Sequence, residues 1–230
     1  MTLVPLGDEA VLATLPDEAA AVRFAAAVRA AAPDWLHDVV PAYATVGVFF
    51  DADRVGTPAV TDWLTAVDVP APRTPQSAPR THTLPVCYEM APDLPRVCEH
   101  TSLAADDVIR LHVGGAYTVY AVGFVPGFPY LGYLPPELCG VPRLATPRLR
   151  VEAGSVGLTG RQTGLYPLPR PGGWNLIGRT PLTVVDVADG FFPLRVGDAV
   201  RFERIDEKRF GELTGERLGG NAECGFRNAE

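Results

Sequence analysis

Lysine is nearly absent from this chain of 230 residues: among its 20 basic residues only Lys208 is a lysine, and the others are arginines. A phosphate-binding P-loop needs the triplet Gly-Lys-Ser/Thr, which does not occur here. Lys208 lies between Glu207 and Arg209, which is not the setting of a Schiff-base lysine or of a biotin attachment site. Phosphate chemistry on this chain must therefore use arginine, backbone amides or a partner protein.

A positive net charge, paired metal ligands and a targeting signal are also missing. The net charge of −7 and the pI of about 5.1 make non-specific binding of nucleic acid a poor expectation. The cysteines (Cys87, Cys98, Cys139 and Cys224) show no CxxC spacing, so we expect reduced thiols and no metal site. Because no basic segment precedes an apolar stretch at the start of the sequence, we expect a cytoplasmic protein.

Residues 111–136 carry no Asp, Glu, Lys or Arg, which is long enough to consider a membrane span. The segment contains Pro126, Pro129 and Pro135 and five glycines, which do not suit a spanning helix. We therefore predict a buried strand followed by a loop, and no membrane association.

The first 68 residues predict a two-layer α+β domain. Apolar runs predict strands at 9–15, 37–43 and 45–50, and helical spacing predicts helices at 17–32 and 57–67. Asp17 and Thr57 are the expected N-caps of the two helices. Residues 69–82 hold prolines at 70, 72, 75 and 79, so we expect an extended linker there.

Residues 83–206 predict a second, mainly-β domain. Strands are expected at 83–88, 118–125 and 196–202, and short helices at 93–100 and 104–112. Between residues 127 and 184 a glycine or proline recurs every few positions, which is typical of the short strands of a barrel or sandwich. Residues 207–230 predict a polar tail that includes a frayed helix.

Arginine is concentrated between residues 141 and 182, where six arginines stand against one acidic residue, Glu152. The six are Arg143, Arg148, Arg150, Arg161, Arg170 and Arg179. Such a concentration in an acidic protein predicts a site for a carboxylate or phosphate. A basic face for an acidic partner, or ion pairs with distant carboxylates, are the alternatives.

Two segments have the composition of a preformed pocket for a small polar ligand. Residues 123–132 place Phe128 and Tyr130 among glycines and prolines, which suits either a pocket wall or a rigid turn. Gln162, Thr163 and Tyr166 are followed by Gly172, Gly173 and Trp174, which offers hydrogen-bonding groups beside an aromatic ring. For Trp174 alone, the role of an ordinary core residue is the stronger prediction.

Ala153-Gly-Ser-Val-Gly157 superficially resembles the nucleophile elbow of a serine hydrolase. An elbow needs a helix after the serine, whereas glycines at 157, 160 and 164 follow here, so we do not expect a hydrolase of that class. The segment predicts a nest of backbone amides around an anion, or a purely structural turn. His112, near the end of a predicted helix, is expected to act at the helix C-terminus rather than as a general base.

The combination of motifs resembles the bacterial KipI family, which includes the B subunit of 5-oxoprolinase and is also known as the allophanate hydrolase subunit 1 family. The resemblance rests on these motifs: Gly123-Phe-Val-Pro-Gly-Phe-Pro-Tyr-Leu-Gly132, Pro142-Arg143, Pro147-Arg148, Ala153-Gly-Ser-Val156, Gln162-Thr-Gly-Leu-Tyr-Pro167, Pro171-Gly-Gly-Trp174 and Ile177-Gly-Arg-Thr-Pro181. Weaker similarity extends upstream, for example at Pro85-Val-Cys-Tyr88. The sequence departs from the family at Glu152 and Arg170, where proline and serine are usual.

This resemblance implies an α+β N-terminal domain followed by a mainly-β, cyclophilin-like barrel. It also implies pairing with the KipA-like C subunit of 5-oxoprolinase, related to biotin-dependent carboxyltransferases, and with a third component, the A subunit. The implied activity is ATP-dependent opening of the lactam 5-oxoproline to glutamate, with ATP and Mg²⁺ bound by the assembled complex. This chain would carry no biotin and would be inactive alone.

The same resemblance suggests roles for the candidate residues. The expected catalytic residues are Arg148, Ser155, Gln162 and Arg179. The two arginines would neutralise phosphate or carboxylate, and Ser155 and Gln162 would orient the reacting groups. The expected substrate-binding residues are Phe128, Tyr130, Arg143, Thr163, Tyr166, Gly172, Gly173 and Trp174.

Three other functions remain open on the sequence. KipI-type proteins can inhibit a sensor histidine kinase, which would make this chain a binding module. An amide- or urea-type carboxyltransferase component is a second alternative. A prolyl isomerase is suggested only by fold analogy, which does not confer activity.

Overall fold

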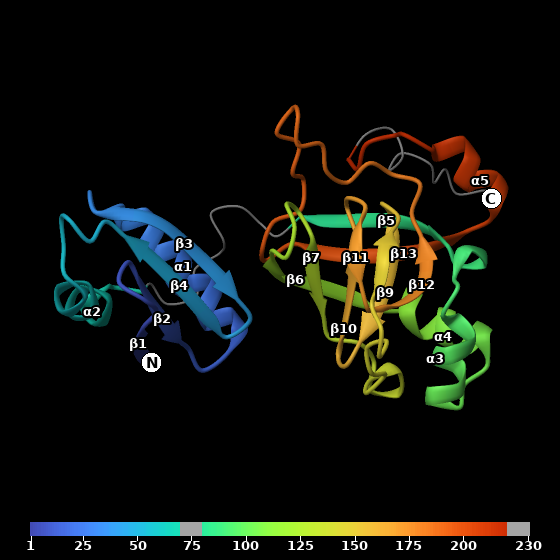
Figure 1. Cartoon of the computed structure of the whole chain (residues 1–230), viewed down its shortest axis with the longest axis horizontal. Coiled ribbons are helices and arrows are strands. Elements are labelled where there is room, and N and C mark those ends of the chain that lie inside the picture. The colour runs from blue at the N-terminus through green and yellow to red at the C-terminus, as the bar shows by residue number, and fades with distance from the viewer. Residues whose placement is uncertain (70–79, 220–230) are drawn as a thin grey trace, which may run out of the picture. The chain divides into compact units, whose positions relative to one another are not determined.

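The computed structural model describes residues 1–69 and 80–219 and divides the chain into two compact units, Met1–Ala78 and Pro79–Glu230 (Figure 1). Residues 70–79 of the predicted linker lie outside the described residues. The next strand, β5 (Thr81–Cys87), begins inside the stretch predicted as linker.

The N-terminal unit contains one antiparallel sheet with the strand order β1-β2-β4-β3. Its strands are β1 (Thr2–Pro5), β2 (Ala10–Thr14), β3 (Leu36–Ala42) and β4 (Thr45–Phe50), and its helices are α1 (Glu18–Ala31) and α2 (Thr57–Ala66). One apolar cluster contains residues of both helices together with β2, β3 and β4. The predicted α+β order is therefore present, with β1 as an added edge strand.

Helix α1 begins where the sequence predicts it, because the Asp17 carboxylate accepts the Ala20 amide at 2.7 Å. The apolar positions at helical spacing, including Phe24 and Val28, are buried against the sheet. Helix α2 differs from the prediction at its cap: Gly56 is the N-cap residue and Thr57 is already helical. Pro58 is thus the second helical residue, where its missing N–H costs no intrahelical hydrogen bond.

The second unit is a closed barrel with the strand order β10-β7-β6-β13-β5-β12-β9. The strands are β5, β6 (Ala116–Val122), β7 (Pro129–Gly132), β9 (Ser155–Thr159), β10 (Gln162–Leu165), β12 (Asn175–Arg179) and β13 (Ala199–Ile205). Strands β5 and β13 pair in parallel over Thr81–Cys87, and every other pair in the barrel is antiparallel. A separate ribbon pairs β8 (Arg148–Val151) with β11 (Arg170–Gly172). The predicted mainly-β barrel is thus confirmed.

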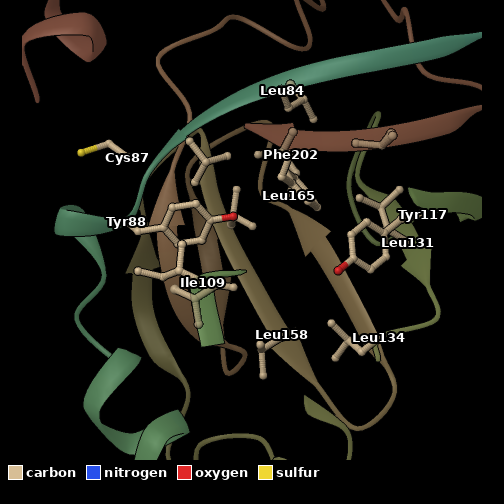
Figure 2. Packing of buried hydrophobic residues seen from close by; sticks show 14 of the residues in the cluster. Leu84, Cys87, Tyr88, Ile109, Tyr117, Leu131, Leu134, Leu158, Leu165 and Phe202 are labelled. Carbon is tan, nitrogen blue, oxygen red and sulfur yellow. The ribbon is translucent and has the colours of Figure 1, made fainter. Parts of the chain in front are cut away.

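The helices α3 (Leu94–Thr101) and α4 (Ala105–Val113) pack beside one another against the barrel, together with the short 3₁₀ turns Tyr88–Met90 and Pro136–Leu138 (Figure 1). The barrel interior is filled by aliphatic and aromatic side chains from the strands and from α4. Figure 2 shows Tyr88 and Tyr117 among these side chains, with their hydroxyl groups inside the packed cluster.

The described part of the predicted tail, residues 207–219, contains helix α5 (Glu207–Leu213) with Asp206 as its N-cap. Leu213 and Leu218 are buried in the barrel cluster, so this segment packs against the barrel instead of extending from it. No helix within residues 1–69 and 80–219 is long and apolar enough to cross a membrane.

Candidate functional site

A cavity of about 240 Å³ lies among the aromatic residues that the sequence singles out. Its walls come from the loop before β7, the loop before β8, the end of β10, and the residues from β11 to β12. The lining residues are Phe124, Phe128, Tyr130, Arg143, Pro147, Tyr166, Pro171, Gly172, Gly173 and Trp174. Small-molecule sites usually enclose roughly 300–1,000 Å³. This aromatic cavity lies just below that range, so it suits a small ligand such as a metabolite of amino-acid size.

Phe128 is the centre of the aromatic wall. Its ring meets Trp174 edge to face, with centroids 5.5 Å apart, and meets Tyr166 in the same way at 5.2 Å. Tyr130 completes the group, with its ring centroid 4.9 Å from that of Phe128. Such edge-to-face contacts hold aromatic rings in one arrangement, so the wall is rigid before any ligand binds.

Two glycines make this packing possible. A Cβ atom on Gly164 would lie 2.8 Å from the Trp174 ring and 3.1 Å from the Phe128 ring. A Cβ atom on Gly172 would lie 2.3 Å from the Tyr166 hydroxyl. The glycine-rich composition of this stretch therefore serves close approach of aromatic rings to the backbone.

Arg143 supplies the positive charge of the aromatic cavity. Within residues 1–69 and 80–219 it forms no ion pair with a carboxylate. Burial raises the pKa of Tyr130 and Tyr166, and the nearby Arg143 charge partly opposes both increases. The two phenols therefore stay protonated and can donate hydrogen bonds beside a cation, which suits a small anion with a polar group of its own.

Phe124 lies at the cavity with its side chain 60% exposed and with a left-handed backbone, φ +67°. A left-handed conformation costs a non-glycine residue of order 1–3 kcal/mol, and such residues gather at ligand sites. The loop from Gly123 to Phe128 is closed by hydrogen bonds from the amides of Gly123 and Phe128.

Seven of the eight residues predicted to bind substrate line the aromatic cavity: Phe128, Tyr130, Arg143, Tyr166, Gly172, Gly173 and Trp174. Thr163 does not, because it is fully buried inside the barrel. Three lining residues were quoted within motifs but were not predicted to bind substrate, namely Phe124, Pro147 and Pro171. The first belongs to the quoted glycine-rich loop and could have been found there; the two prolines carry no chemical signal.

Thr163 belongs to a buried chain of hydrogen bonds with His112 and Tyr88. The Thr163 hydroxyl donates to the Gly157 carbonyl at 3.1 Å and lies 2.9 Å from His112 Nε2. Tyr88 Oη is 2.7 Å from His112 Nδ1. Since the threonine proton goes to the carbonyl, Nε2 must carry the imidazole proton and Nδ1 must accept from the tyrosine.

His112 lies in the last turn of α4, as predicted, but it does not act there as a cation that interacts with the helix C-terminus. The ring is fully buried, stacks on Phe202 at 4.4 Å, and burial lowers its pKa from 6.5 to about 3. The imidazole is therefore neutral, and it joins helix α4 to the barrel through its two hydrogen bonds.

Arg148, a predicted catalytic residue, is held by a carboxylate away from the cavity lining. Its Nη2 donates to Asp93 Oδ1 at 2.6 Å, and Asp93 Oδ2 accepts the Leu176 amide at 2.7 Å. Asp93 is buried, with 6% of its surface exposed. Sequence reasoning missed this partner because Asp93 lies 55 residues before Arg148.

Ser155 and Gln162 also lie outside the lining of the aromatic cavity. Ser155 is buried in β9, and Gln162 pairs with Thr159 at the start of β10. The predicted nest around Ser155 is not formed: the Gly154 amide donates to the Tyr166 carbonyl at 2.7 Å, and the Ser155 amide donates to the Glu152 carbonyl at 3.2 Å. A strand follows the serine, which agrees with the exclusion of a nucleophile elbow.

Arg179 lies in a second cavity, of about 320 Å³, next to helix α5. Glu152 and Arg170, the two departures from the family pattern, line neither of these cavities. Glu152 is paired with Arg150 at 2.7 Å. Among the described residues there is no group of three His, Cys, Asp or Glu side chains that could hold a metal ion.

The two units, an α+β sheet followed by a closed barrel, define a fold that is also found in a urea carboxylase. Urea carboxylase of Kluyveromyces lactis superimposes over 94% of this chain and 23% of its own, with a TM-score of 0.74 at 16% identity. A conserved uncharacterized protein of Pyrococcus horikoshii is 35% identical and matches over 91% of this chain and all of its own, with a TM-score of 0.54.

Residues 1–190 match the carboxyltransferase domain family, subdomain C and D, and the chain belongs to that family. It is 46% identical to the 5-oxoprolinase B subunit of Bacillus subtilis over 55% of this chain and 54% of that protein. It is 53% identical to the Escherichia coli O157:H7 protein of the same name, over 52% of this chain and 56% of that protein. The chain thus matches about half the length of these relatives, and the predicted family membership is confirmed.

Proposed function

We propose that this chain is a subunit of an ATP-dependent 5-oxoprolinase and that its aromatic cavity binds the substrate, 5-oxoproline. The observation that carries the proposal is Arg143, unpaired among the described residues and set inside a rigid aromatic wall, in a chain similar to three proteins named as the B subunit of 5-oxoprolinase. 5-Oxoproline is a small, flat lactam with one carboxylate. Its chemistry therefore matches a cavity that offers one cation, two phenols and stacking surfaces.

In this arrangement the Arg143 guanidinium binds the substrate carboxylate. Tyr130 and Tyr166 donate hydrogen bonds to the polar edge of the lactam, and Trp174 packs against its ring face. Cations and hydroxyl donors at fixed positions stabilise charge without rearrangement, which is the contribution that a phosphoryl-transfer step needs most.

The proposed reaction activates the amide before water opens it. The lactam oxygen attacks the γ-phosphorus of ATP, the bond to the β-phosphate oxygen breaks, ADP leaves, and the lactam nitrogen loses its proton. Water then adds to the activated carbon, and the carbon–nitrogen bond breaks as nitrogen regains protons, which leaves an acyl phosphate of glutamate. A second water hydrolyses this acyl phosphate to glutamate and free phosphate. The described residues that line the cavity include no Asp, Glu or His. We propose that another part of the assembled complex supplies the catalytic base.

The proposed partners are the carboxyltransferase-like C subunit and the A subunit of 5-oxoprolinase, and we propose that this chain is inactive without them. We propose that ATP and Mg²⁺ are bound by the assembled complex. The proposed location is the cytoplasm.

Reconstitution with the two partner subunits tests the proposal. We expect ATP hydrolysis that depends on 5-oxoproline when all three subunits are present, and none when this chain is omitted. An assembled complex that hydrolyses ATP with 5-oxoproline at the same rate without this chain would show that the chain is not required. A folded, assembled complex without turnover would overturn the substrate assignment and favour another amide.

A further inference from the structure

The second cavity, called here the Arg179 cavity, encloses about 320 Å³ between helix α5 and the segments at residues 153–154, 167–168 and 179–185. Its polar lining consists of Arg179 and three threonines, Thr180, Thr183 and Thr214. No carboxylate of the described residues belongs to the lining. The charge at this cavity is therefore positive and favours an anionic ligand.

Arg179 is held in place without being neutralised. Its Nε donates to the Ala153 carbonyl at 3.0 Å, and its guanidinium carbon lies 5.9 Å from the centre of the Phe210 ring. By contrast, Arg148, Arg150 and Arg204 all form ion pairs with carboxylates. Arg179 has no such pair within the described residues, which leaves both terminal Nη groups for a ligand.

Glu152 is the acidic residue whose charge interacts with Arg179, and it is already engaged by another arginine. The hydrogen bond from Arg150 lowers the pKa of Glu152 most, and the charge of Arg179 adds a smaller lowering. Arg150 binds both carboxylate oxygens, at 2.7 and 3.3 Å. The positive charge of Arg179 therefore remains available to the cavity.

Threonine hydroxyls add neutral donors to this charge. Thr180 Oγ1 accepts the Leu182 amide at 3.4 Å and keeps its own proton free to donate. The Thr183 backbone amide donates to the Glu216 carbonyl at 2.7 Å. The Thr183 hydroxyl forms no hydrogen bond with the described residues, so it can donate to a ligand. An arginine fork with neighbouring hydroxyl donors matches the several acceptor oxygens of a phosphate group better than the two of a carboxylate.

The Arg179 cavity and the aromatic cavity are separated by one short segment of chain. Tyr166 lines the aromatic cavity and the next residue, Pro167, lines the Arg179 cavity. Backbone hydrogen bonds between Tyr166 and residues Gly154 and Ser155 fix this segment. A close backbone contact at Gly154, where a Cβ atom would lie 2.3 Å from the Thr180 carbonyl oxygen, fixes the other wall.

We propose that the Arg179 cavity is a phosphate-binding subsite, separate from the cavity that binds the lactam. The claim that this subsite holds a nucleotide phosphate during turnover rests on the proposed function. The claim that it binds phosphate does not. Arg179 would bind two phosphate oxygens through its Nη groups, and the Thr180 and Thr183 hydroxyls would bind the third.

Amide NMR spectra of the full chain, titrated at constant ionic strength with inorganic phosphate and separately with ATP, test this proposal. We expect saturable shifts of the Gly154, Thr180 and Thr183 amides in the millimolar range. The Arg179→Met variant should weaken binding at least 10-fold, whereas Arg170→Met, which changes an exposed arginine outside both cavities, should leave it unchanged. Thr183→Val should weaken binding several-fold without changing the charge.

The two phosphate sources give distinguishable results. If the same amides shift at lower concentrations of ATP than of inorganic phosphate, the cavity is a nucleotide site. If the two ligands bind equally, it is a site for free phosphate. Either result supports the subsite. Absence of saturable shifts with either probe, or equal shifts in Arg179→Met, overturns it. Phosphate binding without 5-oxoproline-dependent turnover in the assembled complex would instead overturn the proposed function alone.

Discussion

Asp93 and Arg148 form a partly buried ion pair, with Oδ1 and Nη2 2.6 Å apart, and the second oxygen of Asp93 accepts the Leu176 amide. The carboxylate thereby joins the start of helix α3 to the ribbon strand β8 and to the barrel strand β12. Arg148 is one of the family-like motif residues, and its charge is used inside the protein. The pair therefore stabilises the walls around the aromatic cavity, and Asp93 balances the charge of Arg148.

Replacing Asp93 by alanine should destabilise the barrel. The change leaves the Arg148 guanidinium, whose side chain is 29% exposed, and the Leu176 amide without their acceptor. Removing one partner of a buried pair costs about 3–5 kcal/mol, and we expect the lower end here because Arg148 is partly exposed. Urea unfolding followed by circular dichroism measures the loss.

Glu152→Ala is the matched control for that experiment. It removes the partner of Arg150 on the same strand, but both side chains of this pair are more than half exposed. We expect its unfolding midpoint to equal that of the wild type within error. Equal effects of Asp93→Ala and Glu152→Ala would contradict the structural role of Asp93.

His112 should make the stability of the barrel depend on pH. Its folded pKa is about 3, whereas in the unfolded chain it returns to about 6.5. Between these values the unfolded state binds a proton that the folded state does not bind. The free energy of unfolding therefore falls as pH falls from about 6.5 toward 3, by up to about 1.4 kcal/mol per pH unit, and is unaffected by this group at higher pH.

Comparison with His112→Asn isolates this contribution from that of other groups. We expect the stability advantage of the wild type over the variant, measured by urea unfolding, to shrink steadily between pH 6.5 and 4.5. The exposed His100 provides a matched His→Asn substitution on the neighbouring helix. An advantage of the wild type that is the same at both pH values would show that His112 titrates alike in the folded and unfolded chain.

Gly164→Ala should displace the aromatic wall. The added methyl group would lie 2.8 Å from Trp174 and 3.0 Å from the Pro129 carbonyl, so the indole must move. Overpacking of this kind costs about 1–3 kcal/mol. We expect a lower unfolding midpoint together with a changed emission maximum of Trp174 fluorescence.

The control for this substitution is Gly211→Ala in helix α5, where nothing lies within 4 Å of the added methyl group. Because alanine favours helix over glycine, stability should rise, by up to about 1 kcal/mol. A stable Gly164→Ala variant with unchanged fluorescence would mean that the wall of the aromatic cavity is not tightly packed.

Local patterns were sufficient to predict most of the fold. Three local signals are followed by the elements they predict: the cap residue Asp17, the apolar spacing around Phe24, and the mostly apolar run of β6. The strands β8 to β12 could not be predicted individually, because each has only three to five residues, which is too short to show a clear period. Helix α5 packs its Leu213 against the barrel, a tertiary contact that a polar sequence does not reveal.

The candidate site was predictable in its residue types and less so in its geometry. Aromatics and glycines at 128–130 and 164–174 do gather at one cavity, partly because β7 and β10 are neighbours in the barrel. The arginines differ in whether a carboxylate neutralises them. Arg148 pairs with Asp93, which lies 55 residues earlier in the sequence. Arg143 and Arg179 lie in two different cavities and pair with no carboxylate in the described part of the chain. Only tertiary structure decides which arginine is neutralised.

The central claim, that the aromatic cavity binds 5-oxoproline through Arg143, is tested most directly by the KM for 5-oxoproline of the reconstituted complex. Losing a charge-assisted hydrogen bond costs about 1.5–3 kcal/mol, so Arg143→Met should raise KM roughly 10- to 100-fold. The Arg170→Met complex should keep the wild-type value, since that exposed arginine lies outside the cavity lining. An unchanged KM in a folded, assembled Arg143→Met complex would contradict the account.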